Sequence, residues 1–370
     1  MKRMMGLSLV LSAILLLTGC GKLTKINELV NQGNEAYKNG DYQAAAEAYT
    51  QVLDLDAKRE LVYNNRGMAY YNLGLYEKAI ADFSSALALD EKSADTFGNR
   101  ALAYQKIGKN AEAEADFTKA LQREETADYY VGRAEVRKAQ GKLQEAEADY
   151  SAALALAPSD EAALNGRGLL YFQTGHYAAA IQDYTQALQL PELSTADKAT
   201  LYWNRAESHN QAEAYEAAAA DYIAYLKTVG TEESRALKKL AFCQEAEGLY
   251  AEAADTLTRL LAVEPADTEA RRSRAQDYYQ LADYEKAAED YTAVLDAAED
   301  YLSYALRGYC YYQLGDAKQA IADLTASIEL NGNYAWAYYI RGTVYRSQED
   351  YKAAQADLEK AIALENQAIE

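Results

Sequence analysis

The sequence has few of the residues that catalytic and metal sites use. Among its 370 residues are two histidines and three cysteines, and neither histidine has a cysteine or second histidine at the spacing of a metal site. Its glycines form no phosphate-binding loop. We therefore expect no enzyme activity, no cofactor and no metal. Because there are only three prolines, and alanine, glutamate, leucine and tyrosine are abundant, we expect an almost wholly helical protein.

Basic charge is also scarce. Lysine and arginine number 37 against 57 aspartates and glutamates, which gives a net charge of −20. A surface this acidic repels the phosphates of nucleic acids and anionic lipid headgroups. The composition therefore argues against nucleic acid as a partner.

Long hydrophobic runs are absent after the first twenty residues. The chain opens with Lys2 and Arg3, continues through an apolar run of roughly 14 residues and reaches Leu17-Thr18-Gly19-Cys20. The run is shorter than the ~20 residues of a spanning helix and is typical of a secretory signal. The last four residues resemble a bacterial lipobox, whose cysteine becomes the lipidated N-terminus. The alternatives are an ordinary cleaved signal and an uncleaved anchor.

The lipobox interpretation sets the expected location of the chain. Residues 1–19 would be a cleaved lipoprotein signal peptide, and residues 20–25 would be the lipidated Cys20 and a short tether. Loss of Lys2 and Arg3 leaves 35 basic against 57 acidic side chains, a mature charge of −22. We expect a protein held to the lipid bilayer outside the cytoplasm, at the outer membrane or at the outer face of the cytoplasmic membrane.

A repeat occupies the rest of the chain. Small residues recur at steps of 34, 34, 33, 34, 38, 35, 34, 33 and 34, and an alanine follows each of them twelve residues later. Such a pair lets two antiparallel helices approach closely, with large residues filling the groove beside it. The small residues are Gly33, Gly67, Ala101, Ala134, Gly168, Ala206, Ala241, Ala275, Gly308 and Gly342.

The period, the small-residue pair and the recurring aromatic positions resemble the tetratricopeptide repeat. The resemblance covers residues 26–368 and implies an all-α, right-handed superhelical solenoid of ten helix-turn-helix repeats. The repeats would start near residues 26, 60, 94, 127, 161, 199, 234, 268, 301 and 335. Four extra residues between repeats five and six predict a hinge at 190–198. No extra helix follows repeat ten, so self-association through an uncovered last repeat is also an expectation.

Arginine and aspartate occur together in eight of the ten repeats. The arginine stands at position 7 and the aspartate sixteen residues later. Repeat one instead has Gln32 with Ala48, and repeat seven has Leu240 with Thr256. Loss of both partners together predicts a structural ion pair between the two helices, because an unpaired buried charge is costly. The alternative is an arginine ladder for an acidic ligand. The predicted pairs are Arg66 with Asp82, Arg100 with Asp116, Arg133 with Asp149, Arg167 with Asp183, Arg205 with Asp221, Arg274 with Asp290, Arg307 with Asp323, and Arg341 with Asp357.

The resemblance also implies where a partner would bind. In the family, the first helix of each repeat lines a concave groove, mainly through positions 2, 5, 6, 9, 12 and 13, which we call the groove positions. Position 6 carries Asn31, Asn65, Asn99 and Asn204. Amides can donate to and accept from an extended peptide backbone. The alternative is that these asparagines only solvate the helix surface.

Aromatic residues at groove positions indicate a second contact. They can anchor a protein partner, stack on sugar rings, or simply pack between repeats. They are Tyr37, Tyr71, Phe172, Trp203, Tyr279, Tyr309, Tyr312, Trp336 and Tyr339.

Together these features predict a scaffold that binds a peptide or partner protein in the bacterial envelope. The rival interpretation is an envelope glycan-binding protein that uses the aromatic groove.

Overall fold

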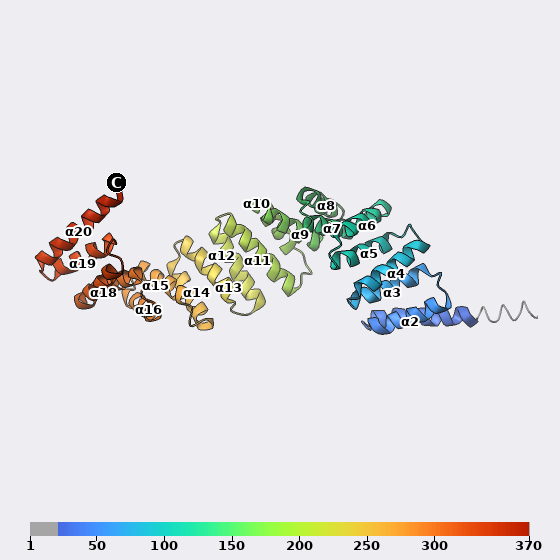
Figure 1. Cartoon of the computed structure of the whole chain (residues 1–370), viewed down its shortest axis with the longest axis horizontal. Coiled ribbons are helices and arrows are strands. Elements are labelled where there is room, and N and C mark those ends of the chain that lie inside the picture. Colours follow the sequence, from blue (N-terminus) through green and yellow to red (C-terminus); the bar gives the residue numbers. More distant parts are fainter. Residues whose placement is uncertain (1–20, 370) are drawn as a thin grey trace, which may run out of the picture. The chain divides into compact units, whose positions relative to one another are not determined.

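The computed structural model describes residues 21–369, and every regular element in that range is an α-helix (Figure 1). Cys20 and the signal sequence lie outside the described residues. The chain divides into two compact units, an N-terminal half that ends at Gly175 and a C-terminal half that begins at His176.

The N-terminal half contains four complete helix pairs and the first helix of repeat five. Its first helix is described over residues 21–38. The helices that follow are α2 (Tyr42–Leu55), α3 (Glu60–Asn72), α4 (Tyr76–Leu89), α5 (Ala94–Lys106), α6 (Asn110–Arg123), α7 (Ala127–Ala139), α8 (Leu143–Leu156) and α9 (Glu161–Gln173). From α2 to α9, each helix packs against the next one in the chain.

The C-terminal half begins with the second helix of repeat five and continues through repeat ten. Its helices are α10 (Tyr177–Leu188), α11 (Thr195–Gln211), α12 (Tyr215–Val229), α13 (Ser234–Ala246), α14 (Tyr250–Val263), α15 (Thr268–Gln280), α16 (Tyr284–Ala297), α17 (Tyr301–Gln313), α18 (Ala317–Leu330), α19 (Ala335–Ser347) and α20 (Tyr351–Ile369). Here too, neighbours in sequence are neighbours in space.

The four extra residues before repeat six lengthen a helix. The first helix is 13 residues long in repeat five, whereas α11 has 17 and begins four residues before the expected start of its repeat. The Ser194 hydroxyl caps this added turn by accepting from the backbone N–H of Asp197. Residues 195–198 of the expected hinge segment are therefore helical, whereas residues 190–194 are not, and the hinge stays a prediction; the boundary between the compact halves falls after Gly175.

Close helix approach explains the small residue at the start of each pattern. A Cβ atom at Gly67 would lie 2.6 Å from the ring of Phe83, and one at Gly33 would lie 2.5 Å from the ring of Tyr49. Both rings are buried. The small residue thus makes room for an aromatic ring from the second helix.

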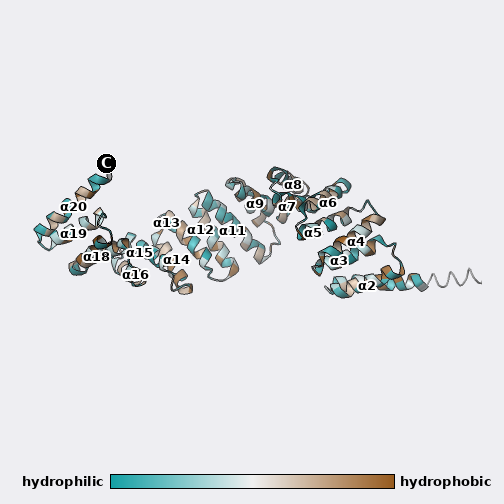
Figure 2. Ribbon diagram, viewed as in Figure 1, coloured by the Kyte–Doolittle hydropathy of each residue, from teal (hydrophilic) through white to brown (hydrophobic). Residues whose placement is uncertain are grey.

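Each helix has a buried and a solvated side. Hydrophobic and hydrophilic residues are interleaved along the helices (Figure 2), and the core consists mainly of alanine, leucine, tyrosine and phenylalanine. Within residues 21–369, no helix has both the length and the hydropathy to cross a bilayer.

Candidate functional site

The arginines of the repeated pattern hold helices together. Arg66 donates from Nε to Oδ2 of Asp82 at 2.7 Å and from Nη2 to Oδ1 at 2.8 Å. Asp82 is buried, and the Arg66 side chain is 16% exposed. The structure shows the same two-pronged contact in six further pairs: Arg100 with Asp116, Arg133 with Asp149, Arg205 with Asp221, Arg274 with Asp290, Arg307 with Asp323, and Arg341 with Asp357. Arg167 and Asp183 belong to different halves, so their pairing stays a prediction.

A hydroxyl group from the preceding repeat completes each arginine site. Arg66 donates from Nη1 to Oγ1 of Thr50 at 2.9 Å, which ties repeat two to repeat one. The other arginines bond a serine or threonine in the same way: Ser84, Thr118, Ser151, Thr185, Thr258, Thr292 and Thr325. Repeat seven has no arginine, and the residue at the hydroxyl position before it is Ile223. Sequence reasoning missed this third partner, although its fixed spacing could have revealed it.

Two of the predicted groove asparagines contact amides of the preceding repeat. The Asn65 side-chain N–H donates to Oδ1 of Asn34 at 3.5 Å, and that of Asn99 donates to Oδ1 of Asn64 at 3.1 Å. Asn31 is exposed on the first helix, and Asn204 is half-buried on α11. Each amide has two N–H groups and a carbonyl oxygen, so these contacts leave capacity for a ligand. The partners Asn34 and Asn64 were not among the predicted residues.

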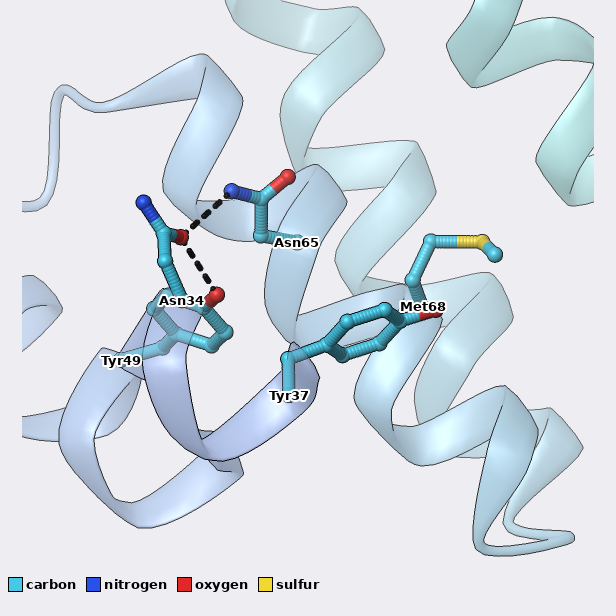
Figure 3. A pocket seen from close by; sticks show the side chains of 5 residues that line it. All are labelled: Asn34, Tyr37, Tyr49, Asn65 and Met68. Carbon is cyan, nitrogen blue, oxygen red and sulfur yellow. Dashed lines mark hydrogen bonds between the residues drawn. The ribbon is translucent and has the colours of Figure 1, made fainter. Parts of the chain in front are cut away.

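A cavity of about 230 Å³ lies at this amide contact, between repeats one and two. Figure 3 shows Asn34 between Asn65 and the hydroxyl of Tyr49, which donates to Asn34 Oδ1 at 2.7 Å. Tyr37 and Met68 supply the apolar part of the wall. The cavity therefore combines an amide edge with an aromatic and aliphatic surface.

The predicted groove aromatics are mostly half-buried, and many of them contact other rings. Only Tyr339, which is 52% exposed, lies largely in solvent. Tyr37 packs edge-on against Tyr42, with ring centroids 5.2 Å apart, and Tyr71 packs in the same way against Tyr76. In repeats one and two, the aromatic residue at position 12 thus contacts the tyrosine that begins the second helix. The sequence analysis did not predict this contact.

Four groove aromatics of the C-terminal half form one connected cluster. The Tyr309 ring lies 5.5 Å from Tyr279, 6.4 Å from Tyr312 and 5.7 Å from Trp336, measured between centroids. In repeat six, the guanidinium of Arg235 lies 4.0 Å from the Trp203 ring centroid. Packing between neighbouring repeats therefore occupies part of the surface of these rings.

The two cysteines of the described residues are buried in the core, and His209 is partly buried. Burial raises the pKa of the Cys243 thiol to about 11 and that of Cys310 to about 12, which keeps both protonated at neutral pH. Burial also lowers the pKa of His209, and the opposing charge of Asp221, 3.9 Å away, does not reverse the shift. These groups pack against neighbouring helices rather than forming a reactive cluster.

Comparisons with solved structures agree on the fold. PilW, described as a widely conserved type IV pilus biogenesis factor, is 22% identical, with a TM-score of 0.51 over 58% of this chain and 96% of that one. The C-terminal part of a tetratricopeptide repeat-containing protein from Cytophaga hutchinsonii is 17% identical, with a TM-score of 0.55 over 66% of this chain and 98% of that one. A search of curated proteins finds no significant match.

Family profiles cover most of the described chain. Tetratricopeptide repeat profiles match residues 30–94, 99–161, 132–195, 165–233, 244–301, 272–335 and 337–367. Proteins of this family are scaffolds for protein-protein interaction rather than enzymes. The chain belongs to the tetratricopeptide repeat family.

Proposed function

We propose that this protein is a lipid-anchored scaffold of the bacterial envelope, which holds an extended segment of a partner protein along the first helices of its repeats. The observation that supports this most directly is the cavity between repeats one and two, where the Asn34 and Asn65 amides stand beside Tyr37. Amides can bond a peptide backbone whatever its sequence, while the ring offers apolar contact. An extended polypeptide would use both the hydrogen bonds to its backbone and the apolar contact with its side chains.

The lipid anchor would place this cavity near a membrane. Only the five residues of 21–25 separate Cys20 from the expected start of repeat one, and five residues span at most ~18 Å even when fully extended. An acyl group on Cys20 would hold the first repeats close to the bilayer surface. The scaffold would then present its partner at the membrane.

Crosslinking from the groove positions tests partner binding. We expect a photoreactive benzoylphenylalanine at Tyr71 to capture the same envelope protein as one at Trp203, because both positions face the groove in this interpretation. The control is the same group at Glu112, an exposed residue on the second helix of repeat three. Capture of the same protein from Glu112, or of none from either groove position, would contradict the proposal.

The aromatic cluster of Tyr279, Tyr309 and Trp336 favours glycan binding as a second candidate function, because sugar rings stack on flat aromatic faces. Both tryptophans of the chain, Trp203 and Trp336, lie in the C-terminal half. If soluble cell-wall glycans quench tryptophan emission while crosslinking captures no protein, the glycan function is the correct one.

Replacing the lipidated cysteine tests the anchor. We expect Cys20→Ser to move the protein from the membrane fraction to the soluble fraction, because the serine cannot carry the thioether-linked lipid. Cys310→Ala, which alters a buried thiol, is the matched control and should remain in the membrane fraction. Membrane retention of Cys20→Ser would show that the anchor is of another kind.

A further inference from the structure

Repeat seven departs from the ion-pair pattern in a way that leaves its interior neutral. Leu240 is buried in place of the arginine, and the Thr256 hydroxyl donates to Oε1 of Gln244 at 2.8 Å. An apolar contact and a neutral hydrogen bond thus replace the Arg-Asp pair inside this repeat.

Two carboxyl groups occupy the neighbouring interface between repeats seven and eight. Asp277, at position 10 of repeat eight, is 1% exposed, and its Oδ2 has no hydrogen-bond partner. Glu245, at position 12 of repeat seven, is half-buried. Position 10 carries an uncharged residue in the other repeats from two to ten: Ala69, Ala103, Val136, Leu170, Ser208, Cys243, Cys310 and Val344. A buried carboxylate without a partner costs folding free energy. We therefore expect this group either to hold a proton or to be compensated by a ligand.

A cavity of about 330 Å³ is lined by residues of α13, α14 and α15 and by Asp267; Glu245 belongs to its wall and Asp277 does not. Phe242, Leu257 and Leu260 form its apolar wall, and Glu245 and Glu269 add acidic groups. Asp277 stands on the same stripe of α15 as Ala270 and Ser273, which line the cavity, at the helical spacing of three and then four residues. Burial, and then the charge of Glu245, raise the pKa of Asp277 to about 7.

The basic side chains in and around the cavity are paired with acidic groups, and one of these pairs, Lys238 with Asp267, belongs to the cavity wall itself. Lys238 of α13 bonds Asp267 at 2.7 Å and Glu264 at 3.0 Å, and Lys239 bonds Glu207 at 3.1 Å. Arg274 of α15 is held by Asp290 of α16. Over residues 21–369, neither Glu245 nor Asp277 forms an ion pair with a basic side chain.

We propose that the cavity between repeats seven and eight binds the guanidinium group of an arginine side chain from the partner polypeptide. The inference rests on the proposed scaffold function. It adds that one segment of the partner must contain an arginine. The guanidinium lies against the half-exposed side chain of Phe242, and Glu245 accepts its hydrogen bonds.

Charge complementarity argues for a basic occupant. The chain carries a net charge of −20, so a basic segment is drawn toward it and a second copy of the chain is repelled. Phe242 is 50% exposed although its ring packs in a T-shaped contact with Tyr215, with centroids 5.8 Å apart, so half of the side chain is accessible to a planar cation. A neutral or acidic side chain would leave Glu245 without a charged partner.

Peptide binding to the full mature chain tests the site. The probe is a short glycine-serine peptide with one central arginine, compared by titration calorimetry with the same peptide carrying citrulline, the neutral isostere of arginine. We expect the arginine peptide to bind about tenfold more tightly, since it alone makes a charge-assisted contact with Glu245. Equal affinity for the two peptides would overturn the proposal.

Two variants separate the site from general electrostatic attraction. Glu245→Gln should abolish the preference for arginine, whereas Glu247→Gln, which removes the same charge at an exposed position outside the cavity, should retain it. A preference that survives Glu245→Gln, or is lost equally in both variants, contradicts a specific site. Thermal melts of both variants show whether each one is folded.

The same variant distinguishes this proposal from the scaffold function. If Tyr71 crosslinking captures a partner equally well in the Glu245→Gln chain, and the arginine preference is absent in the native chain, the scaffold stands and the arginine site is wrong. If no partner is captured but arginine is preferred, the site stands without the scaffold.

Discussion

Replacing Arg100 by leucine is expected to lower the free energy of unfolding of the N-terminal half by about 3 to 5 kcal/mol. Asp116 is buried and accepts from Arg100 at 2.6 and 3.0 Å. Leucine would leave this carboxylate in the interior with its charge uncompensated. The change also removes the 3.0 Å bond from Arg100 to Ser84 and with it a tie to repeat two.

The double variant Arg100→Leu with Asp116→Thr should be less destabilised than Arg100→Leu alone. It reproduces the pair found in repeat seven, where Leu240 and Thr256 are both buried. Because the second change removes the uncompensated carboxylate, the two effects should be far from additive. Hydrogen exchange of the α5 and α6 amides in the full chain reports the stability of this region.

Lys119→Met supplies the control for loss of a positive charge near Asp116. Lys119 lies 3.9 Å from Asp116 and is 51% exposed, so its removal should cost less than about 1 kcal/mol. If Arg100→Leu costs no more than Lys119→Met, or if the double variant equals the sum of the singles, the arginine is not a buried structural partner.

Replacing Asp277 by asparagine is expected to stabilise the C-terminal half at neutral pH by up to about 4 kcal/mol. Burial and the charge of Glu245 raise the pKa of Asp277 from 3.8 to about 7. A group whose pKa is higher in the folded state stabilises the fold at low pH, and this contribution is lost as the pH rises toward the folded value. The native chain should therefore lose stability from this group between about pH 4 and 7, and the asparagine variant should not.

Urea denaturation at several pH values, followed by the emission of Trp203 and Trp336, measures this difference in the full chain. His209 titrates with the opposite sign, because burial lowers its pKa. Comparing native and variant chains at each pH cancels that contribution. Asp255→Asn, at an exposed position on α14, is the control and should follow the native curve. A native curve parallel to that of Asp277→Asn would show that Asp277 keeps its ordinary pKa.

The ion pairs illustrate how far the sequence alone can lead. The spacing of Arg66 and Asp82, together with the joint loss in repeat seven, predicted a contact between two helices, and the structure places the two groups 2.7 Å apart. The bond from Arg66 to Thr50 was not predicted, because it joins different repeats and depends on how consecutive pairs stack. Contacts within a repeat follow from helical geometry, whereas contacts between repeats depend on the packing.

The contacts of the groove residues also could not be predicted from the sequence. Asn65 and Trp203 were identified by their positions in the repeat, but the bond from Asn65 to Asn34 and the cation over the Trp203 ring involve neighbouring repeats. Contacts between neighbouring repeats therefore already use some of the hydrogen-bonding groups of Asn65 and part of the ring surface of Trp203. What remains for a partner is an edge of each amide and a face of each ring.

The sequence by itself determined the helical class, the repeat period and the tetratricopeptide family, because a 34-residue pattern of small and aromatic residues can bury its apolar side only as paired helices stacked on their neighbours. Only the tertiary structure decided that Asp277 and Glu245 share one interface beside a cavity. In the sequence, Glu245 resembles an ordinary acidic residue on a helix, and Asp277 stands out only as a charge at a position that is uncharged in the other repeats from two to ten. Their burial, and the cost of leaving them unpaired, arise only when repeat eight packs onto repeat seven.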